Sequence, residues 1–249
     1  MKNKAKERIG ETNINNFGSE MTIIEYENNR NATVEFKNGY VKKCEYRQFK
    51  DGGVKSPYDK TVYNKGFIGE GPHKPNEIKK YNTWKCLIER IYIDRGDKYK
   101  NYQKCSICKK WLNYQNFAGW YENSYYKVKN EIMTIDKDII CKGNKIYSPE
   151  KCVFVPQRIN NLFCKSDSAR GKYPIGVYYK KENNKFISSL KGLNNKRIYL
   201  GSFDSVKKAF LAYKERKEKV IKKVAEKYKN KIPKKLYNAM CNYKVEIGD

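Results

Sequence analysis

Apolar and polar residues alternate in short runs through the first part of the chain, between residues 11 and 71. Alternation with a period of two is typical of strands that bury one face. Asn38-Gly39 separates two of these runs and is typical of a two-residue hairpin turn. We therefore expect residues 11–71 to form a small β-rich module.

The pattern becomes helical after a break rich in proline and glycine, in a second region that we place at residues 76–165. Trp84, Leu87 and Ile91 recur at the spacing of one helix face. We expect a helix that buries these side chains in a core, because apolar residues at this spacing need no cofactor to explain them.

A strand–turn–strand–helix pattern ends the second region. We expect the first strand at residues 135–140 and the second at residues 151–156, with Gly143-Asn144 in the turn between them. The residues after Pro156 predict the first turns of a helix. This order of elements predicts that the hairpin and the helix pack together.

Three short strands and one long helix are expected in a third region, residues 172–230. Asp204 or Ser205 can cap this helix, and Pro233 stops it. Residues 231–249 are expected to form a helical tail. The three regions together predict a multidomain α+β protein. The strands of the third region are expected at residues 175–181, 185–191 and 197–203.

The chain carries 54 Lys and Arg against 27 Asp and Glu, a formal net charge of +27 spread along its 249 residues. Because a folded protein tolerates such self-repulsion best beside a polyanion, we expect nucleic acid as the partner. A membrane surface is the rival polyanion, and a solvated, lysine-rich surface without such a partner is the alternative. The sequence has no apolar run of about 18 residues, no signal peptide and no lipidation motif. We therefore expect no membrane partner and a cytoplasmic protein.

Asp136 in the hairpin and Asn160 in the helix offer hard oxygen ligands. Such ligands suit Mg²⁺ or Mn²⁺, which keep several waters and take phosphate oxygens from a substrate. A divalent ion held there would polarise a phosphodiester and stabilise the leaving 3′ oxygen. A plain β-hairpin with solvated polar side chains is the alternative.

The segment IDKD…GNKIYSPEKCVFVPQRIN resembles the ββα-metal motif of HNH endonucleases, most closely the homing endonucleases of phages and mobile introns. The resemblance covers the hairpin and its helix well and the rest of the second region more loosely. It implies that Asp136 and Asn160 are metal ligands and that Lys137 stands where the family has its catalytic histidine. The asparagine that braces the loop in this family falls near Tyr147 or, with a shift, at Asn144.

Lys137 is the departure from that family. A lysine with an ordinary pKa near 10.4 is neutral in roughly 0.04% of molecules at pH 7, so we expect a cation that holds the scissile phosphate or offsets transition-state charge. Water activation then falls to the metal or to Asp138, which shares a face with Asp136 if the strand is regular. His73, the only histidine, lies in a turn-like segment and is the remaining candidate for the base.

Cys105 and Cys108 have the spacing of zinc ligands, and some HNH enzymes fix their hairpin with four cysteines. No second pair at that spacing occurs, so further ligands would have to come from Cys141, Cys152 or Cys164. Reduced, free cysteines are the alternative to a structural Zn²⁺ ion.

The third region resembles the AP2 type of DNA-binding domain, on the evidence of Gly176-Val177, Phe186, the run YLGSFDS and the helix KKAFLAY. The resemblance implies a three-stranded antiparallel sheet packed on one helix, with the exposed sheet face in the major groove of DNA. Lysine and arginine on such a face contact phosphates or guanine edges. The residues expected to bind DNA are Tyr179, Lys181, Lys191, Lys196, Arg197, Arg170 and Lys172, with Tyr178 as a further candidate.

Both resemblances and the positive charge predict a homing-type DNA endonuclease that binds double-stranded DNA and nicks or cleaves it by metal-assisted hydrolysis, with no small-molecule cofactor. If a phage encodes it, the expected location is the cytoplasm of the bacterial host. We expect its metal site to stay foldable when residues 173–249 are removed. The alternatives are a non-enzymatic DNA-binding protein with a decayed HNH site and an RNA-binding protein that stacks bases on its tyrosines. The expected catalytic residues are Asp136, Lys137, Asp138 and Asn160.

Overall fold

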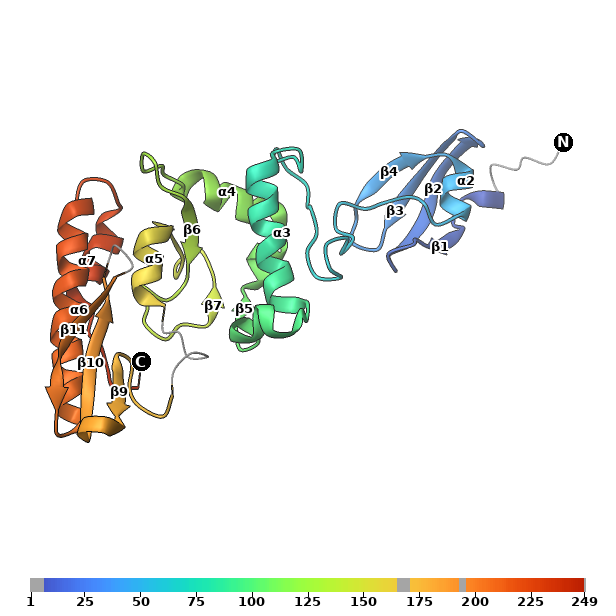
Figure 1. Cartoon of the computed structure of the whole chain (residues 1–249). Coiled ribbons are helices and arrows are strands. Elements are labelled where there is room, and N and C mark those ends of the chain that lie inside the picture. The colour runs from blue at the N-terminus through green and yellow to red at the C-terminus, as the bar shows by residue number, and fades with distance from the viewer. Residues whose placement is uncertain (1–6, 165–170, 193–195, 249) are drawn as a thin grey trace. The chain divides into compact units, whose positions relative to one another are not determined.

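The computed structural model describes residues 7–164, 171–192 and 196–248 as a mixed α+β structure with several small sheets (Figure 1). The expected α+β class is therefore confirmed. None of the helices in these ranges is both long enough and apolar enough to cross a membrane.

Contacts within the chain define two compact units, and these do not follow the expected domain limits. The region expected at residues 76–165 is divided between the units. Its hairpin strands share one unit with the three-stranded sheet of the third region. Unit 1 contains Met1–Asn123 and Ile146–Ser148, and unit 2 contains Ser124–Lys145 and Pro149–Asp249.

Unit 1 begins with a four-stranded antiparallel sheet in the order β1-β2-β3-β4, followed by the short helix α2. Met21 and Ile23 of the sheet are fully buried with Phe49 of the helix. Gly39 turns the chain between β3 and β4 at φ +83, so the hairpin expected at Asn38-Gly39 is confirmed. The elements are β1 (Thr12–Ile14), β2 (Glu20–Asn28), β3 (Asn31–Phe36), β4 (Val41–Cys44) and α2 (Tyr46–Lys50).

The rest of unit 1 is helical and has an aromatic core. Trp84 and Trp111 are fully buried, and the Trp84 indole N–H donates to the Trp111 carbonyl at 2.6 Å. The expected helix is confirmed as α3, in which Leu87 is buried and Ile91 half-buried. Two-residue strands β5 and β7 pair in parallel. The elements are α3 (Ile78–Tyr92), η1 (Gly96–Tyr102), β5 (Ser106–Ile107), η2 (Lys109–Leu112), α4 (Tyr114–Ser124) and β7 (Ile146–Tyr147).

Strands β6 and β8 of unit 2 form the expected antiparallel hairpin, with Asp136 opposite Val153. Helix α5 begins directly after Pro156, as the sequence predicts. The first strand, however, ends at Asp136, whereas the apolar pattern extends it to Ile140. The elements are β6 (Met133–Asp136), β8 (Val153–Pro156) and α5 (Gln157–Phe163).

A three-stranded antiparallel sheet in the order β11-β10-β9 precedes the long helix α6, as the third region predicts. Of the two expected cap residues, Ser205 is the one used, because its hydroxyl oxygen accepts the Lys208 N–H at 3.3 Å. Pro233 lies between α6 and a last helix, α7. The elements are β9 (Val177–Lys180), η4 (Lys181–Asn183), β10 (Lys185–Lys191), β11 (Arg197–Phe203), α6 (Val206–Tyr228) and α7 (Lys234–Asn242).

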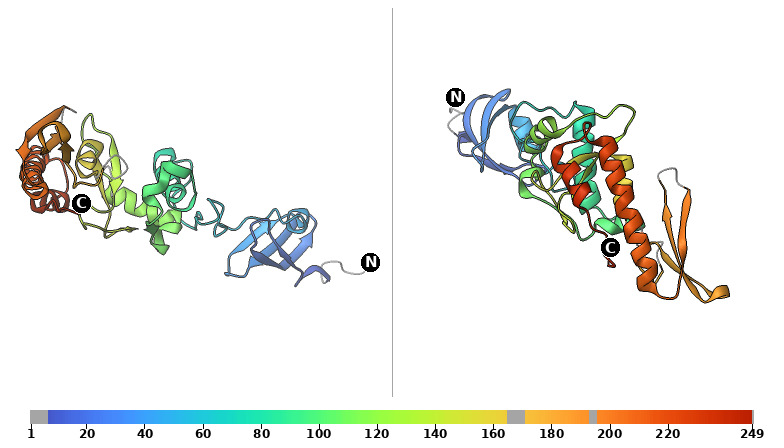
Figure 2. Two further views of the ribbon diagram at one scale, coloured as in Figure 1. Left: turned by 60° about the horizontal axis from the view of Figure 1, so that its bottom comes forward. Right: turned by 90° about the vertical axis from the view of Figure 1, so that its left-hand side faces the viewer.

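The long helix α6 lies beside the three-stranded sheet at one end and beside α7 at the other (Figure 2). Its side chains contribute to two hydrophobic cores of unit 2. Its first half packs Phe210 and Tyr213 beneath the three-stranded sheet. Its second half packs Ile221 and Val224 in one core with the hairpin and α5. This shared core corrects the expectation that residues 173–249 can be removed without unfolding the hairpin, because their loss would expose its apolar side chains.

Ile221→Ala tests whether α6 completes the core of the hairpin. Ile221 is 1% exposed, so its truncation should lower the free energy of unfolding by about 2–4 kcal/mol. Hydrogen exchange should also become faster at the backbone amides of β6 and β8. Leu211→Ala, at a position that is 50% exposed on the same helix, should cost less than about 1 kcal/mol. Unchanged exchange in both strands would show that the hairpin is stable without α6.

Candidate active site

The Asp136 carboxylate organises the turn that follows strand β6. Its Oδ1 atom accepts the backbone N–H groups of Asp138, at 2.9 Å, and Ile139, at 2.6 Å. These bonds take the place of strand pairing and bend the backbone. Asp138 therefore does not continue a regular strand from Asp136, contrary to expectation, yet the two carboxyl groups lie within hydrogen-bonding reach of each other.

Burial makes the Asp136 carboxyl group an unusually weak acid. The residue is 9% exposed. Burial raises its pKa, and the negative charge of Asp138 raises it further. The two backbone N–H groups act in the opposite direction. Together these effects raise the pKa of Asp136 from 3.8 to about 6. At neutral pH the hairpin thus holds a buried carboxylate next to a second one, an arrangement that a nearby cation stabilises.

Asn144 braces the loop between β6 and β8. Its side-chain amide is buried and donates to the backbone carbonyl of Lys137 at 2.7 Å. Gly143, at φ +80, allows the tight turn before it. Of the two positions left open for a bracing residue, the structure therefore places Asn144 across the loop. Tyr147 instead belongs to unit 1, where it is buried and hydrogen-bonds Arg90.

Lys137 lies in the same turn and is largely buried. Its Nζ atom is 3.2 Å from Oδ2 of Asp138, whose side chain is 40% exposed. The ammonium group is therefore held beside the carboxyl group of Asp138 and offsets part of its negative charge.

Asn160 lies on helix α5, which packs against both hairpin strands. Cys164 follows one turn later, and its thiol lies 3.7 Å from the Asn160 carbonyl oxygen. Burial raises the pKa of this thiol, and the charges of Asp136 and Asp138 raise it further, so the thiol lies near both carboxyl groups. Cys164 is the extended residue that follows the last turn of α5, and its contact with Asn160 is made by the Asn160 backbone carbonyl.

Lys217 is a second cation near this group, and the sequence did not indicate it. It lines a small cavity together with Cys164 and Phe163, at the end of α5. Burial lowers the pKa of Lys217, and its interaction with Cys164 opposes that shift. Helix α6 carries many lysines, and only the packing of α6 against α5 distinguishes this one from the rest.

The register of the three-stranded sheet decides which side chains face away from α6. Ile187 pairs with Tyr178, so these two share one face. Phe186 pairs with Tyr179 on the opposite face and packs in the core formed with α6. Tyr179 therefore does not lie on the exposed face, contrary to expectation, and its ring contacts that of Phe186 at 5.2 Å between centroids.

The exposed side of this sheet, here called the open face, carries Tyr178, Lys191, Arg197 and Tyr199. Tyr199 is 63% and Tyr178 41% exposed. The Arg197 guanidinium lies over the Tyr178 ring at 5.7 Å, and Arg197 pairs across the strands with the exposed Lys191. The sequence did not indicate Tyr199. Of the other residues expected to bind DNA, Lys172, Lys181 and Lys196 are exposed, and Arg170 lies outside the described residues.

The positive charge is distributed unevenly, contrary to the expectation from the whole-chain total. Residues 11–71 contain nine basic and nine acidic residues. Residues 172–249 contain twenty-one Lys and Arg against seven Asp and Glu. Residues 172–249 therefore contribute +14 of the net charge of +27, about half of the long-range attraction to a polyanion, whereas residues 11–71 contribute none.

Cys105 and Cys108 flank strand β5, and the Cys108 N–H donates to the Tyr147 carbonyl at 2.9 Å. All eight cysteines are free thiols. In the part of the chain that the structure describes, neither Cys105 nor Cys108 joins a group of three side chains whose ligand atoms converge. The structure therefore adds nothing in favour of a structural Zn²⁺ ion at this pair.

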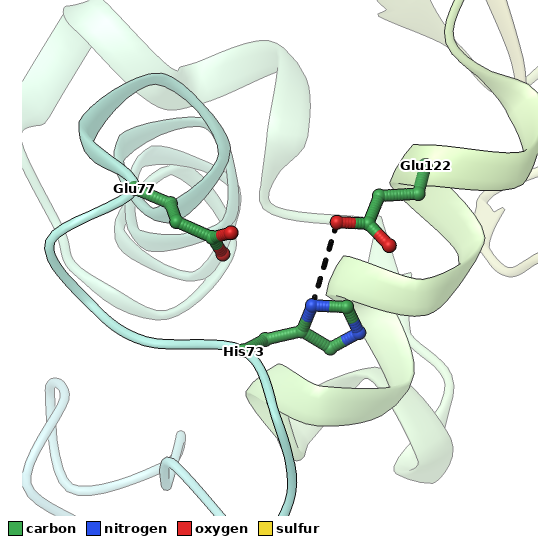
Figure 3. A group of neighbouring side chains, drawn as sticks. All are labelled: His73, Glu77 and Glu122. Carbon is green, nitrogen blue, oxygen red and sulfur yellow. Dashed lines mark ion pairs between the residues drawn. The ribbon is translucent and has the colours of Figure 1, made fainter.

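His73, Glu77 and Glu122 are the one convergent group of this kind among the described residues (Figure 3). The His73 Nδ1 atom is 3.5 Å from Oε1 of Glu122. Lys80 already supplies a cation, because its Nζ atom pairs with Glu77 at 3.0 Å and also with Glu122. Lys80 therefore neutralises part of the negative charge of the two carboxylates, and its ion pairs link α3 to α4. His73 belongs to unit 1, whereas Asp136 belongs to unit 2.

Asp136→Asn should stabilise the protein above about pH 6 when divalent ions are removed. A folded-state pKa raised to about 6 means that the protonated carboxyl favours folding. In wild type, the protonated carboxyl contributes fully to the free energy of unfolding below about pH 4, and this contribution is lost as the pH rises through 6. The asparagine does not titrate, so the free energy of unfolding of the variant relative to wild type should rise by on the order of 3 kcal/mol from pH 4 to well above pH 6. Urea unfolding in EDTA at several pH values measures the difference.

Asp204→Asn is the matched control for that pH series. A hydrogen bond from Lys185 lowers the pKa of Asp204, so the ionised form of this carboxyl favours folding. The stability of Asp204→Asn relative to wild type should therefore not increase as the pH rises. An Asp136→Asn protein no more stable than wild type at pH 8 would contradict the raised pKa.

Comparisons with family models, with curated proteins and with solved structures find no match to this chain. A functional assignment therefore depends on the geometry of the hairpin, of helix α5 and of the open face.

Proposed function

We propose that the protein is a metal-dependent endonuclease of the HNH homing type that nicks or cleaves duplex DNA. The group around Asp136 carries this proposal. A buried carboxyl group with a raised pKa ends the first strand of a hairpin, and an asparagine braces the following loop. A helix that carries Asn160 begins after the second strand and packs against both strands. The order strand, loop, strand, helix is that of the motif which the sequence resembles.

Asp136 and Asn160 are the residues that would hold Mg²⁺ or Mn²⁺. Both offer hard oxygen atoms, and the two neighbouring carboxyl groups of Asp136 and Asp138 form an anionic site of the kind that divalent ions prefer. When bound, such an ion polarises the phosphodiester and stabilises the leaving oxygen.

Lys137 and Asp138 divide the remaining chemistry. The Lys137 ammonium is held at 3.2 Å by Asp138 and supplies a fixed positive charge to the scissile phosphate and its transition state. Asp138 is the more exposed carboxyl, so it can contact water and accept the proton of the attacking molecule. This division requires no neutral lysine.

The open face holds the duplex in this proposal. Arg197 and Lys191 contact phosphates or guanine edges, while the rings of Tyr178 and Tyr199 offer apolar contact to bases. The strong positive charge of residues 172–249 supplies the attraction that does not depend on sequence.

A non-enzymatic DNA-binding protein is the second candidate function. The ion pair between Lys137 and Asp138 favours it, because the two side chains neutralise each other where the HNH family has a histidine base. The open face and the charge of residues 172–249 serve DNA binding in both candidates, so only an assay of cleavage separates them.

Asp136→Ala and Asn160→Ala should each lower the cleavage of supercoiled plasmid in Mg²⁺ or Mn²⁺ by about 100-fold or more, because each removes a metal ligand. Asn161→Ala is the matched control: Asn161 is exposed and accepts a hydrogen bond from Gln157, so its loss should leave cleavage intact. All three variants should still shift duplex DNA in a gel.

Lys137 variants in the same assay separate its possible roles. As a cation, Lys137→Arg should keep part of the activity and Lys137→Ala should lose most of it. As a base, Lys137→Arg should be as inactive as Lys137→Ala, because a guanidinium does not take up a proton. If wild type and Lys137→His both leave the plasmid intact with either ion, the endonuclease proposal fails and the DNA-binding alternative replaces it.

Arg197→Ala and Tyr199→Ala should each weaken duplex binding by about 10-fold, measured by fluorescence anisotropy. The wild-type slope of log K against log salt should be about −5 or steeper. Lys37→Ala, an 82% exposed side chain in the neutral segment 11–71, is the control and should bind like wild type. A slope near −1, or an equal loss for Lys37→Ala, would contradict binding through the open face.

A further inference from the structure

Two hydrophobic cores meet on helix α6 without a break. The core beneath the sheet contains Phe210, and the core that includes the hairpin and α5 contains Ile221 and Val224. The partly buried side chains of Val220 and Tyr243 pack against both cores. The sheet and the hairpin are therefore built on one continuous helix.

The C-terminal segment braces α6 where the two cores meet. The Val245 N–H donates to Oε1 of Glu218 at 2.9 Å, and the Val245 carbonyl accepts from Nζ of Lys214 at 2.6 Å. The Tyr243 ring packs edge-on against Phe163 at the end of α5, with 4.8 Å between ring centroids. Bending of the helix at this point would break contacts on both sides of it.

The hairpin loop is tied to the same segment. Lys142, two residues before the bracing Asn144, donates through Nζ to the Lys244 carbonyl at 2.8 Å and pairs with Glu246 at 3.1 Å. The loop that carries the candidate catalytic residues therefore has a direct connection to the segment that braces α6.

Helix α6 spans the distance between the core beneath the sheet and the core that contains the hairpin. Phe210 lies beneath the sheet, and Val224, fourteen residues later, lies in the core with the hairpin. At about 1.5 Å of rise per residue, these two points are about 21 Å apart along α6. The same length of duplex DNA contains about six base pairs.

We infer that helix α6 is a rigid spacer that fixes where the duplex is cut relative to the sequence held by the open face. This inference rests on the proposed function. The group around Asp136 and the open face belong to one packed body, so the cut falls at a constant offset from the bound sequence. The base sequence at the cut position then has little influence on where the duplex is cut.

A duplex library with a randomised segment tests this inference. Full-length Asp136→Ala protein selects the duplexes that bind, and hydroxyl-radical footprinting locates the bound sequence. Wild-type protein with Mg²⁺ then cuts the selected duplexes, and mapping of the new ends gives the offset between footprint and cut. We expect a single offset, constant to one base pair and within about one helical turn, or about 10 base pairs.

Insertion of a few base pairs between the footprint and the cut decides the outcome. The offset should stay the same, so that the cut moves into the inserted sequence. A cut that stays with its original sequence, or cuts spread over many positions, would overturn the inference while leaving the endonuclease activity established. Duplex binding with no cut at all would instead overturn the proposed function and the inference with it.

Val220→Gly tests the helix itself. The change removes a side chain that contacts both cores and adds a flexible residue to the middle of α6, so the cuts should spread over several offsets while plasmid cleavage persists. Lys219→Ala, at an exposed neighbouring position, should keep the single offset. A single offset in folded Val220→Gly protein would show that α6 is not the spacer.

Discussion

Burial of one side of helix α6 is the interaction on which unit 2 depends. An isolated two-stranded hairpin is marginally stable in water, and the strands β6 and β8 have only four residues each. The sheet β9–β11 likewise needs a covering layer for its apolar face. Helix α6, with 23 residues, is long enough to cover both, and α7 adds Leu236 and Met240 to the core with the hairpin.

Asp136 shows how one carboxyl group meets a structural and a chemical requirement together. As a hydrogen-bond acceptor it ends β6 and sets the turn that positions Lys137 and Asp138. As a buried anion beside a second carboxyl group, it destabilises the folded protein at neutral pH, and its raised pKa has the same cause. An asparagine could satisfy the turn without the charge, so the turn alone does not explain why an acid stands at this position.

The individual elements could be predicted because their signals are local: the hairpin at Asn38-Gly39 and the strands and helix of the third region depend on residues close in sequence. The end of β6 could not be predicted from alternation, because the Asp136 side chain captures the backbone. Tyr178 and Tyr179 are neighbours in sequence, and only the pairing with β10 decides which one is exposed. Lys217 could not be singled out from the other lysines of α6, because its position beside Cys164 depends on contacts between α5 and α6, which lie far apart in the sequence.

The equal numbers of acidic and basic residues in residues 11–71 bear on how such a chain can evolve. This segment has a core of its own, around Met21 and Phe49, and it adds no net field to the strongly positive remainder. Recombination that replaced it would leave the long-range attraction of the other parts almost unchanged. Residues 11–71 can therefore change in evolution without altering either the two hydrophobic cores of unit 2 or the electrostatic attraction of the other parts of the chain.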